Sequence, residues 1–437
     1  MANNEKSGHR NRGKGGQRMK YEEYKDSGVE WIGEVPSHWE VMRFKDFTSL
    51  QTTASDNMNK IGLENIEGKT GRFIESDSEF EGNGIAFNIG DVVYGKLRPY
   101  LQKVWIATFS GNAVGDFFVF RPKDNCYNQY LFYCMLSDGF TSMCNGSTVG
   151  AKMPRVSSDF IRSLHYYLPP LSEQQAIATY LDEKCGEVNC AIDVQKKKIE
   201  LLNELKQTII TDAVTKGLNP NAPMKDSGVE WIGKVPEHWK VMRLRFACEF
   251  RNGYTPSKTN SDFWENGTIP WYRMEDIRES GRFLNEAKQY ITEEAVKGNG
   301  LFEAGSFILA TTATIGEHAM LIADSQANQQ LTNLKIRKLL SNRLSRHFLF
   351  YYLFVIDDYC KSTTRTATFP AVNMDDLKNF GVTIPPLQEQ QAIIAHIEQE
   401  TGKIDFQIAK ANSRIELLEE LKQSIITEAV TGKIKIC

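Results

Sequence analysis

Apolar residues follow a heptad pattern in two long segments, one near the middle of the chain and one at its end. In the first segment the apolar seam alternates spacings of four and three residues: Leu181, Cys185, Val188, Ile192, Gln195, Ile199 and Leu202. The second segment repeats this seam at Ile397, Thr401, Ile404, Ile408, Ala411, Ile415 and Leu418. A heptad seam is typical of helices that pack side by side. We therefore predict two long helices that pair antiparallel as a coiled-coil rod; two unrelated core helices are the simpler alternative.

Both predicted helices carry further local signals. Pro169 and Pro170 favour an extended approach to the first helix, and Ser172 with Gln175 resembles a capping box. Gly186 and Gly402 occupy equivalent positions in the two helices, which predicts a kink or a close helix contact there.

The chain repeats itself. KDSGVEWIGEVPSHWEVMR at residues 25–43 returns at residues 225–243 with three changes, a shift of 200. PPLSEQQAIA at residues 169–178 and IELLNELKQTIITDAVT at residues 199–215 both return 216 positions later. About 120 residues between these blocks differ in the two halves. We infer a duplication, in which nearly identical repeated blocks, called here the frames, surround two divergent inserts.

The inserts have the pattern of mixed α/β domains. Short strands are expected at 91–94, 104–108 and 116–121, and helices at 128–137 and 343–359. The fold class is therefore α/β (α+β), with two globular domains separated by the helix pair and related by an internal pseudo-two-fold repeat. The predicted boundaries are a disordered basic tail at 1–19, a first domain at 20–168, a helix at 169–215, a linker at 216–222, a second domain at 223–384 and a second helix at 385–437.

Composition narrows the class of protein. The chain has 437 residues, 41% hydrophobic and 24% charged, which excludes a largely disordered protein. No segment approaches the roughly 18 consecutive apolar residues of a membrane span, and the start lacks the apolar region of a secretory signal. The eight cysteines form no C-x-x-C pair, so we expect reduced thiols in a cytoplasmic protein.

Charge is distributed unevenly. The net charge is −3, yet residues 1–20 hold six bases and one acid, and residues 91–165 hold eight bases and five acids. A basic face on an acidic protein is compatible with this distribution.

Several short segments resemble catalytic motifs, but the residues around them do not match those motifs. FEGNG at residues 80–84 resembles a methyltransferase loop but follows a polar run, and no NPP-[FY] tetrapeptide exists, so a turn is the better interpretation. Gly68-Lys69-Thr70 lacks the preceding glycine of a P-loop. Glu204-Leu205-Lys206 and its copy at 420–422 mimic a nuclease motif, but we expect them on solvated helix faces.

Histidine offers no catalytic site either. His38 and His238 recur in the frames between a proline and a tryptophan, without ligand partners, and a packing role is expected. We predict no catalytic residue and no metal site.

The clearest binding signal is YGKLRPYLQK. It places three bases and two tyrosines without an acid: Tyr94, Lys96, Arg98, Tyr100 and Lys103. Bases supply phosphate and base-edge contacts to nucleic acid, and tyrosines pack on sugars or bases. The segment is a candidate DNA-binding loop.

A second candidate loop is STVGAKMPRVS at residues 147–157, with Lys152 and Arg155. Its counterpart, 216 positions later, holds Thr364, Arg365 and Thr366, and Arg273 is a further candidate in the second insert. Ordinary solvated loops are the alternative for all of these segments.

The repeated frames match a known pattern of motifs. PPLxEQQAIA opening a long helix, LLxELKQxIITxAVT, WIGxVPxHW and GKLRPYL together resemble the specificity subunit of type I restriction–modification systems. The resemblance covers residues 20–437, in the family order of variable domain, helix, variable domain, helix. The basic tail before Met19 departs from the pattern.

The resemblance implies a function. Each insert would be a target-recognition domain that reads one half of a bipartite, asymmetric double-stranded DNA target. The helices would set the gap between the half-sites and dock two methyltransferase subunits, to which motor-endonuclease subunits add. The residues expected to carry these spacer and docking roles are Leu181, Val188, Ile192, Ile199, Leu202, Ile397, Ile404, Ile408, Ile415 and Leu418.

Cofactors would lie elsewhere in the complex. This chain would hold none; S-adenosylmethionine, ATP and magnesium would bind only to partner subunits, where adenine is methylated. Two alternatives remain open: a bivalent protein-interaction scaffold without a DNA role, and a self-sufficient methyltransferase, which lacks its motifs here.

Overall fold

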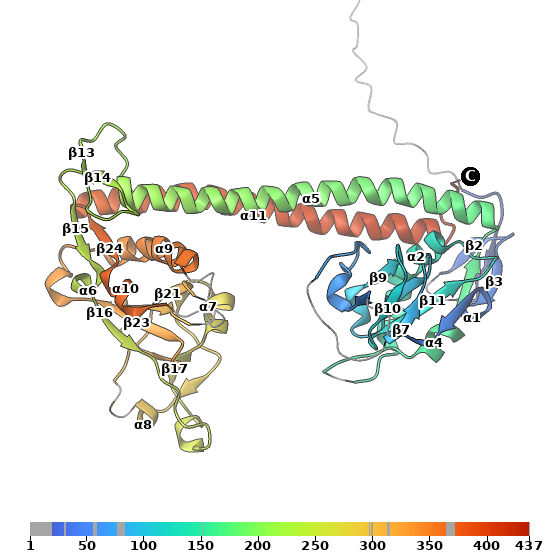
Figure 1. The fold of residues 1–437 in the computed structure, drawn as a ribbon, viewed down its shortest axis with the longest axis horizontal. Coiled ribbons are helices and arrows are strands. Elements are labelled where there is room, and N and C mark those ends of the chain that lie inside the picture. The colour runs from blue at the N-terminus through green and yellow to red at the C-terminus, as the bar shows by residue number, and fades with distance from the viewer. Residues whose placement is uncertain are drawn as a thin grey trace, which may run out of the picture. The chain divides into compact units, whose positions relative to one another are not determined.

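A computed structural model describes residues 20–29, 32–55, 59–76, 84–150, 152–296, 298, 300–312, 315–363 and 372–436 (Figure 1). The chain divides into two compact units: unit 1 comprises residues 1–196 and 412–437, and unit 2 comprises residues 197–411. The two long helices, α5 (Leu171–Lys216) and α11 (Leu387–Val430), each contribute to both units. The prediction of two long helices is confirmed.

Unit 1 contains the first insert. Its strands are β1 (Tyr24–Asp26), β2 (Glu34–Pro36), β3 (Glu40–Arg43), β4 (Thr48–Gln51), β5 (Ala54–Ser55), β6 (Lys60–Ile61), β7 (Gly84–Phe87), β8 (Val92–Gly95), β9 (Val104–Ile106), β10 (Gly111–Ala113), β11 (Phe117–Pro122) and β12 (His165–Leu168). Its short helices are α1 (Phe44–Phe47), η1 (Leu63–Asn65), η2 (Pro99–Leu101), α2 (Asn128–Leu136), α3 (Asp138–Gly146) and α4 (Ser158–Ser163). The strands and the helix expected between residues 91 and 137 are all present.

Unit 2 contains the second insert. Its strands are β13 (Met224–Asp226), β14 (Lys234–Pro236), β15 (Lys240–Arg243), β16 (Cys248–Asn252), β17 (Ile269–Tyr272), β18 (Phe283–Leu284), β19 (Tyr290–Ile291), β20 (Phe307–Ala310), β21 (His318–Leu321), β22 (Gln326–Ala327), β23 (Leu331–Ile336) and β24 (Gly381–Ile384). Its short helices are α6 (Leu244–Ala247), η3 (Ser261–Phe263), α7 (Met274–Ser280), α8 (Glu293–Val296), η4 (Lys338–Leu340), α9 (Arg346–Thr363) and α10 (Met374–Asn379). Helix α9 confirms the helix expected over residues 343–359.

The two divergent inserts share one sheet topology. The central sheet has the order β4-β11-β8-β9 in unit 1 and β16-β23-β20-β21 in unit 2, where β18 adds a parallel edge strand. All other neighbours in these two sheets are antiparallel. The prediction of mixed α/β inserts is therefore confirmed, and the strand order of the central sheet is duplicated in the two inserts although their sequences differ.

Each insert leaves and rejoins the frame through a pair of antiparallel strands. In unit 1, β3 pairs with β12 and places Arg43 opposite His165. In unit 2, β15 pairs with β24 and places Arg243 opposite Gly381. The ends of each insert therefore lie side by side, whatever its internal sequence.

Both long helices are part of the domain cores. The core of unit 1 includes Ile177 and Leu181 of α5 and Ile426 of α11. The core of unit 2 includes Val214 of α5 and Ile393 of α11. In each unit, α5 and α11 lie side by side (Figure 1), and burial of these apolar side chains drives their docking.

The repeated histidine and tryptophan of the frames bind the repeated glutamate at the start of each long helix. In unit 1, His38 Nε2 lies 2.8 Å from a Glu173 oxygen and Trp39 Nε1 donates to the other oxygen at 3.1 Å. His238 and Trp239 hold Glu389 in the same way, at 2.6 and 2.8 Å. The packing role expected for these histidines is therefore accompanied by a hydrogen bond to a carboxylate more than 130 positions away in the sequence.

Helix α5 begins at Leu171, so Ser172 lies in its first turn rather than at the predicted cap. Gln174, two residues further on, instead joins the start of α5 to the first insert. Gln174 accepts from the Tyr127 amide and donates to the carbonyls of Asn125 and Pro169, at 2.8 to 2.9 Å. Gln390 makes the equivalent three bonds in unit 2.

The lysines of the repeated Glu-Leu-Lys segments cross-link the helix pair. Lys422 is 2% exposed and donates to Asn189 Oδ1 at 2.9 Å and to the Lys69 carbonyl at 3.1 Å. Its counterpart Lys206 pairs with Asp405 at 2.6 Å, and Asp405 is the counterpart of Asn189. The prediction of a solvated face is therefore wrong for Lys422, whereas Lys206, 29% exposed, lies in a surface ion pair.

The helix glycines do not mark a close contact. A Cβ atom built on Gly186 or Gly402 would meet no atom within 4 Å. Both positions are open, which corrects the expectation of tight packing there.

Candidate nucleic-acid interface

The two loops singled out in the first insert meet on one surface of unit 1. Leu97 and Arg155 form an isolated antiparallel bridge. The Arg98 amide donates to the Pro154 carbonyl at 2.8 Å, and the Val156 amide donates to the Lys96 carbonyl at 3.2 Å. Residues about 55 positions apart in sequence thus form one main-chain platform.

Most of the candidate side chains on this platform are accessible. Arg98 and Lys152 are exposed, and Tyr100 is 51% exposed. Arg98 itself has φ +52°, an unusual backbone conformation that begins the short helix η2. The platform combines cationic and aromatic groups, as nucleic-acid surfaces do.

Two further bases on the platform are held by neighbours. Arg155 donates to Asp116 Oδ1 at 3.1 Å while its side chain stays 46% exposed. The Lys96 ammonium lies 5.2 Å from the centre of the Phe118 ring. These contacts fix the direction of each cation without removing it from the surface.

Tyr94 and Lys103 are corrections to the predicted set. Tyr94 is 1% exposed and packs edge-on against Phe140, so its ring belongs to the core, and burial raises its pKa well above the usual value. Lys103 Nζ donates to the carbonyls of Leu63 and Ile66 at 2.7 and 2.6 Å, and burial lowers its pKa. Tyr94 therefore has no free surface for DNA, and Lys103, which is half-buried, has its ammonium held by the two carbonyls.

Of the DNA-binding residues predicted in the second insert, Arg273 lies among the described residues. Arg273 is half-buried, and its guanidinium pairs with Glu275 at 3.0 Å. Its main-chain amide donates to Asp276 at 2.7 Å, so it starts helix α7. Thr364, Arg365 and Thr366 lie outside the described residues.

The structure reveals a counterpart of the GKLRPYL loop that the sequence did not. The loop between β20 and β21 occupies the same place as the loop between β8 and β9 in the shared strand order. The Val372 amide donates to the Thr311 carbonyl at 2.9 Å, as the Val156 amide does to Lys96. Gln102 (φ +49°) and Gly316 (φ +92°) both turn the chain into the following strand. Only the 216-residue shift between Val156 and Val372 signalled this equivalence in the sequence.

No metal centre is found among the residues that the structure covers. They include no group of three or more His, Cys, Asp or Glu side chains that could hold a metal ion. Lys69 of the Gly-Lys-Thr turn pairs with Glu419 at 2.6 Å instead of facing a phosphate site. Phe80 to Asn83 of FEGNG lie outside the described residues, and Gly84 begins β7. Within the described helices, none has the length and apolar character needed to cross a membrane.

Comparison with known proteins gives a consistent result. A family profile described as "Type I restriction modification DNA specificity domain" matches residues 36–204 and 236–417. The EcoprrI type I restriction enzyme specificity subunit of Escherichia coli is 42% identical over 161 residues, which are 36% of this chain and 40% of that protein. The MjaVIII specificity subunit of Methanocaldococcus jannaschii is 24% identical over 429 residues, covering 92% of this chain and 94% of that one.

A solved structure supports the fold. It comes from a study of complex assembly and conformational transition of the type I R-M system, and it is 20% identical to this chain. It superposes with a TM-score of 0.65 over 91% of this chain and 98% of that one. The two profile matches together cover both frames and both inserts, so this chain belongs to the family of type I restriction–modification DNA specificity domains.

Proposed function

We propose that this chain is the DNA sequence-specificity subunit of a type I restriction–modification complex. In this proposal the domain at residues 20–168 reads one half of a bipartite target, and the domain at residues 223–384 reads the other. The observation that carries it is the platform of unit 1, where two separate basic loops meet with Arg98, Tyr100 and Lys152 accessible. A low total charge is compatible with DNA binding, because partner subunits can add phosphate contacts.

The chain would act without catalysis of its own. S-adenosylmethionine, ATP and magnesium would bind to methyltransferase and motor-endonuclease partners, and the assembled complex would methylate adenine. A non-DNA scaffold would explain the helix pair, but it gives no reason for the convergence of the two basic loops.

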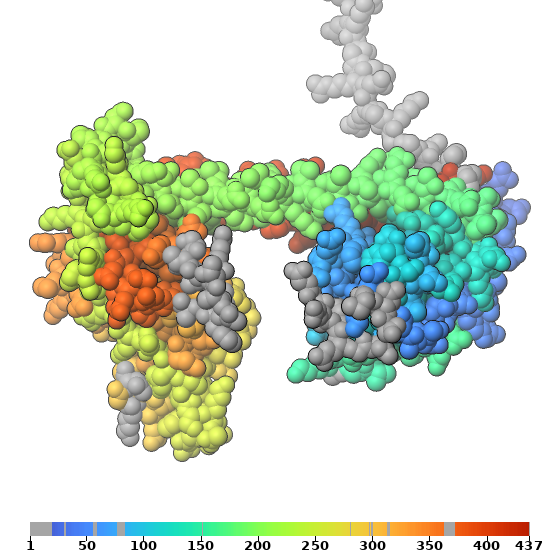
Figure 2. All heavy atoms as spheres, in the orientation of Figure 1, coloured from blue at the N-terminus to red at the C-terminus, as the bar shows by residue number. Residues whose placement is uncertain are grey.

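We further propose that the helix pair docks two methyltransferase subunits through outward-facing leucines. Half of the ten seam residues first named for docking are buried and have no free surface: Leu181, Val188, Ile192, Ile397 and Ile404. Leu201 and Leu205 of unit 2 are exposed, and so are their counterparts Leu417 and Leu421 of unit 1. On the face drawn in Figure 2, α5 is open to solvent along its length. Two matched apolar surfaces suit two copies of one partner.

The DNA-reading proposal is tested with Arg98→Ala and Arg155→Ala. The complex with methyltransferase subunits is titrated with cognate duplex over a range of salt concentrations. Loss of one phosphate contact should make the slope of log K against log salt shallower by about one unit. Arg162→Ala is the matched control, because Arg162 is also a half-exposed, ion-paired base of unit 1. Wild-type affinity and slope for both test variants would contradict the proposed surface.

The docking proposal is tested separately. Leu201→Asp with Leu205→Asp should remove one methyltransferase subunit from the complex in native mass spectrometry, and Leu417→Asp with Leu421→Asp should remove the other. Leu339→Asp is the control, because Leu339 is an exposed leucine of unit 2 that lies in η4, outside the two long helices α5 and α11. Full occupancy in both double variants would contradict this docking surface.

A further inference from the structure

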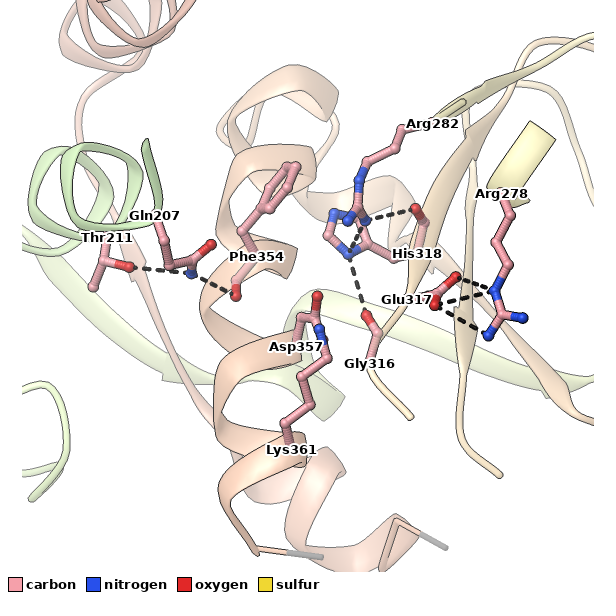
Figure 3. A network of polar contacts seen from close by, with 10 residues as sticks. All are labelled: Gln207, Thr211, Arg278, Arg282, Gly316, Glu317, His318, Phe354, Asp357 and Lys361. Carbon is pink, nitrogen blue, oxygen red and sulfur yellow. Dashed lines mark hydrogen bonds and ion pairs between the residues drawn. The ribbon is translucent and has the colours of Figure 1, made fainter. Parts of the chain in front are cut away.

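The loop between β20 and β21 is flanked by two cations in unit 2. Arg278 lies on α7, and Lys361 lies near the end of α9 (Figure 3). Arg278 Nε lies 3.3 Å from Glu317 in this loop. Lys361 Nζ lies 2.7 Å from Asp357, one turn earlier on α9. Neither base is among the binding residues predicted from the sequence, because each has acidic neighbours in its own segment.

In both ion pairs the acid is turned inward and the base outward. The side chain of Glu317 is 22% exposed and that of Arg278 is 52% exposed. The contrast is larger in the second pair, with 8% for Asp357 and 50% for Lys361. The outer surface therefore presents positive charge although each pair is neutral, and an anion can approach either base without breaking its ion pair.

The buried acid of the second pair also contacts the loop. A Cβ atom built on Gly316 would lie 2.0 Å from Asp357 Oδ1, so the loop backbone packs directly against this carboxylate. Gly316 has φ +92°, a conformation that glycine tolerates and other residues rarely adopt. The position of Lys361 is thus linked to the path of the loop.

Beneath the loop, Arg282 anchors the start of β21. Its Nη1 lies 3.1 Å from both His318 Nδ1 and the His318 carbonyl, and its guanidinium lies 4.5 Å from the centre of the Phe354 ring (Figure 3). His318 is fully buried. This anchor holds the loop between the two outward bases.

The first domain has one comparable ion pair. Arg155, beside the β8–β9 loop, is 46% exposed, and its partner Asp116 is 33% exposed. We propose that Arg278 and Lys361 contact the DNA half-site read by the second domain, on either side of the β20–β21 loop. The inference rests on the proposed function and assigns residues to its second half.

The test uses the complex with methyltransferase subunits and a duplex whose target is first identified from the methylation pattern of the wild-type complex. Arg278→Gln and Lys361→Gln remove the charges and keep a hydrogen-bond donor for Glu317 and Asp357. For each variant the affinity should fall about three- to tenfold, and the slope of log K against log salt should become shallower by about one unit. Arg278→Lys and Lys361→Arg keep the charges and should retain the wild-type slope.

Lys288→Gln is the matched control, because Lys288 is an exposed base of unit 2 paired with Glu279 of α7. Wild-type affinity and slope for both glutamine variants, as for Lys288→Gln, would overturn the inference. Equal losses in the glutamine variants and in the charge-retaining variants would also overturn it, because the effect would then be structural. If the wild-type complex shows no sequence-dependent binding at all, the proposed function fails instead.

Discussion

At the scale of single residues, the buried charged groups of unit 1 differ in whether they have a charged partner. Arg121 donates through Nε and Nη2 to the two oxygens of buried Asp91, at 2.8 Å each, and this raises the pKa of Arg121. Lys422 is different, because it donates to the neutral amide oxygen of Asn189 and to a main-chain carbonyl, and burial lowers its pKa. A buried base without a close carboxylate costs stability.

Asn189→Asp should therefore stabilise unit 1. The introduced carboxylate would give Lys422 the partner that Asp405 gives Lys206, and we expect a gain of about 1 kcal/mol in the free energy of unfolding at pH 7. Thermal unfolding measures it, and Asp405→Asn should lower the stability of unit 2 by a similar amount. An unchanged or lowered unfolding midpoint for Asn189→Asp would show that desolvation of the new carboxylate outweighs the ion pair.

The pH dependence of that gain follows from both groups. The pKa of the introduced carboxylate should be depressed beside Lys422, so the gain is present above its unfolded value of about 4 and is lost as pH falls through the folded value. In the wild type the lowered pKa of Lys422 costs stability below its folded value. This cost disappears as pH rises toward the unfolded value of about 10.5, so the two proteins should converge in alkaline solution.

At the scale of secondary-structure elements, the sequence patterns that gave correct predictions were local ones. The heptad seam predicted α5 and α11, because a helix makes its periodicity within a few turns. The paired strands at the ends of each insert were not predicted from the sequence. Strands β3 and β12 are only four residues long, and they pair residues more than 120 positions apart. Such pairing leaves no local pattern to detect.

Tyr94 shows why a candidate binding residue was misplaced. Val92 and Tyr94 of β8 face one core cluster, while Val93 faces another. A strand buried on both faces loses the alternation of apolar and polar positions that distinguishes a surface tyrosine from a core one. Arg98, Tyr100 and Lys152 follow strand ends and turns, and they are exposed as expected.

The open glycines of the long helices predict a stabilising change. Gly186→Ala and Gly402→Ala should each raise the free energy of unfolding by about 0.5–1 kcal/mol, because alanine loses less backbone entropy and the added methyl group meets no atom. Gly217→Ala is the contrasting control. Gly217 ends α5 with φ +76°, and its Cβ would lie 3.0 Å from Trp239, so this variant should be destabilised. Denaturant titration of the three variants distinguishes these outcomes, and a loss of stability in both helix variants would contradict the argument.

At the scale of the whole molecule, the proposed function gives α5 and α11 the role of setting the gap between half-sites. Adding four residues to each helix, after Lys197 and after Ala411, lengthens it by about 6 Å and turns it by about 40°. One DNA base pair corresponds to about 3.4 Å and roughly 35°. A four-residue insertion is a stutter that a coiled coil accommodates by local unwinding.

We therefore expect the unread gap to lengthen by one or two base pairs, with both half-sites unchanged. Methylome sequencing measures the gap directly. Substituting four exposed residues at the same places, without insertion, should leave the gap as it is. An altered half-site with an unaltered gap would contradict the role of the helices.

The last prediction concerns exchange of the inserts. Because Arg43 lies opposite His165 and Arg243 lies opposite Gly381, residues 44–164 should fit into the place of residues 244–380 without a change in the frame. The two shortest ion pairs between the first insert and the long helices, Lys69 with Glu419 and Arg72 with Asp193, would lose their partners there. The counterpart positions on the helices are Asn203 and Ala409.

A complex built with a chain that carries two copies of residues 44–164 should methylate targets that contain two copies of one half-site, because in the proposed function reading depends on the insert and docking depends on the frame. Adding Asn203→Glu and Ala409→Asp restores the missing partners, and it should raise the unfolding midpoint slightly, since exposed ion pairs contribute up to about 1 kcal/mol each. Methylome sequencing with and without these two changes tests both parts. If the second original half-site persisted, the determinants of sequence would lie outside the inserts. If methylation were lost although the methyltransferase subunits still bound, the insert would need more of its own unit than the strand pair and these two acids.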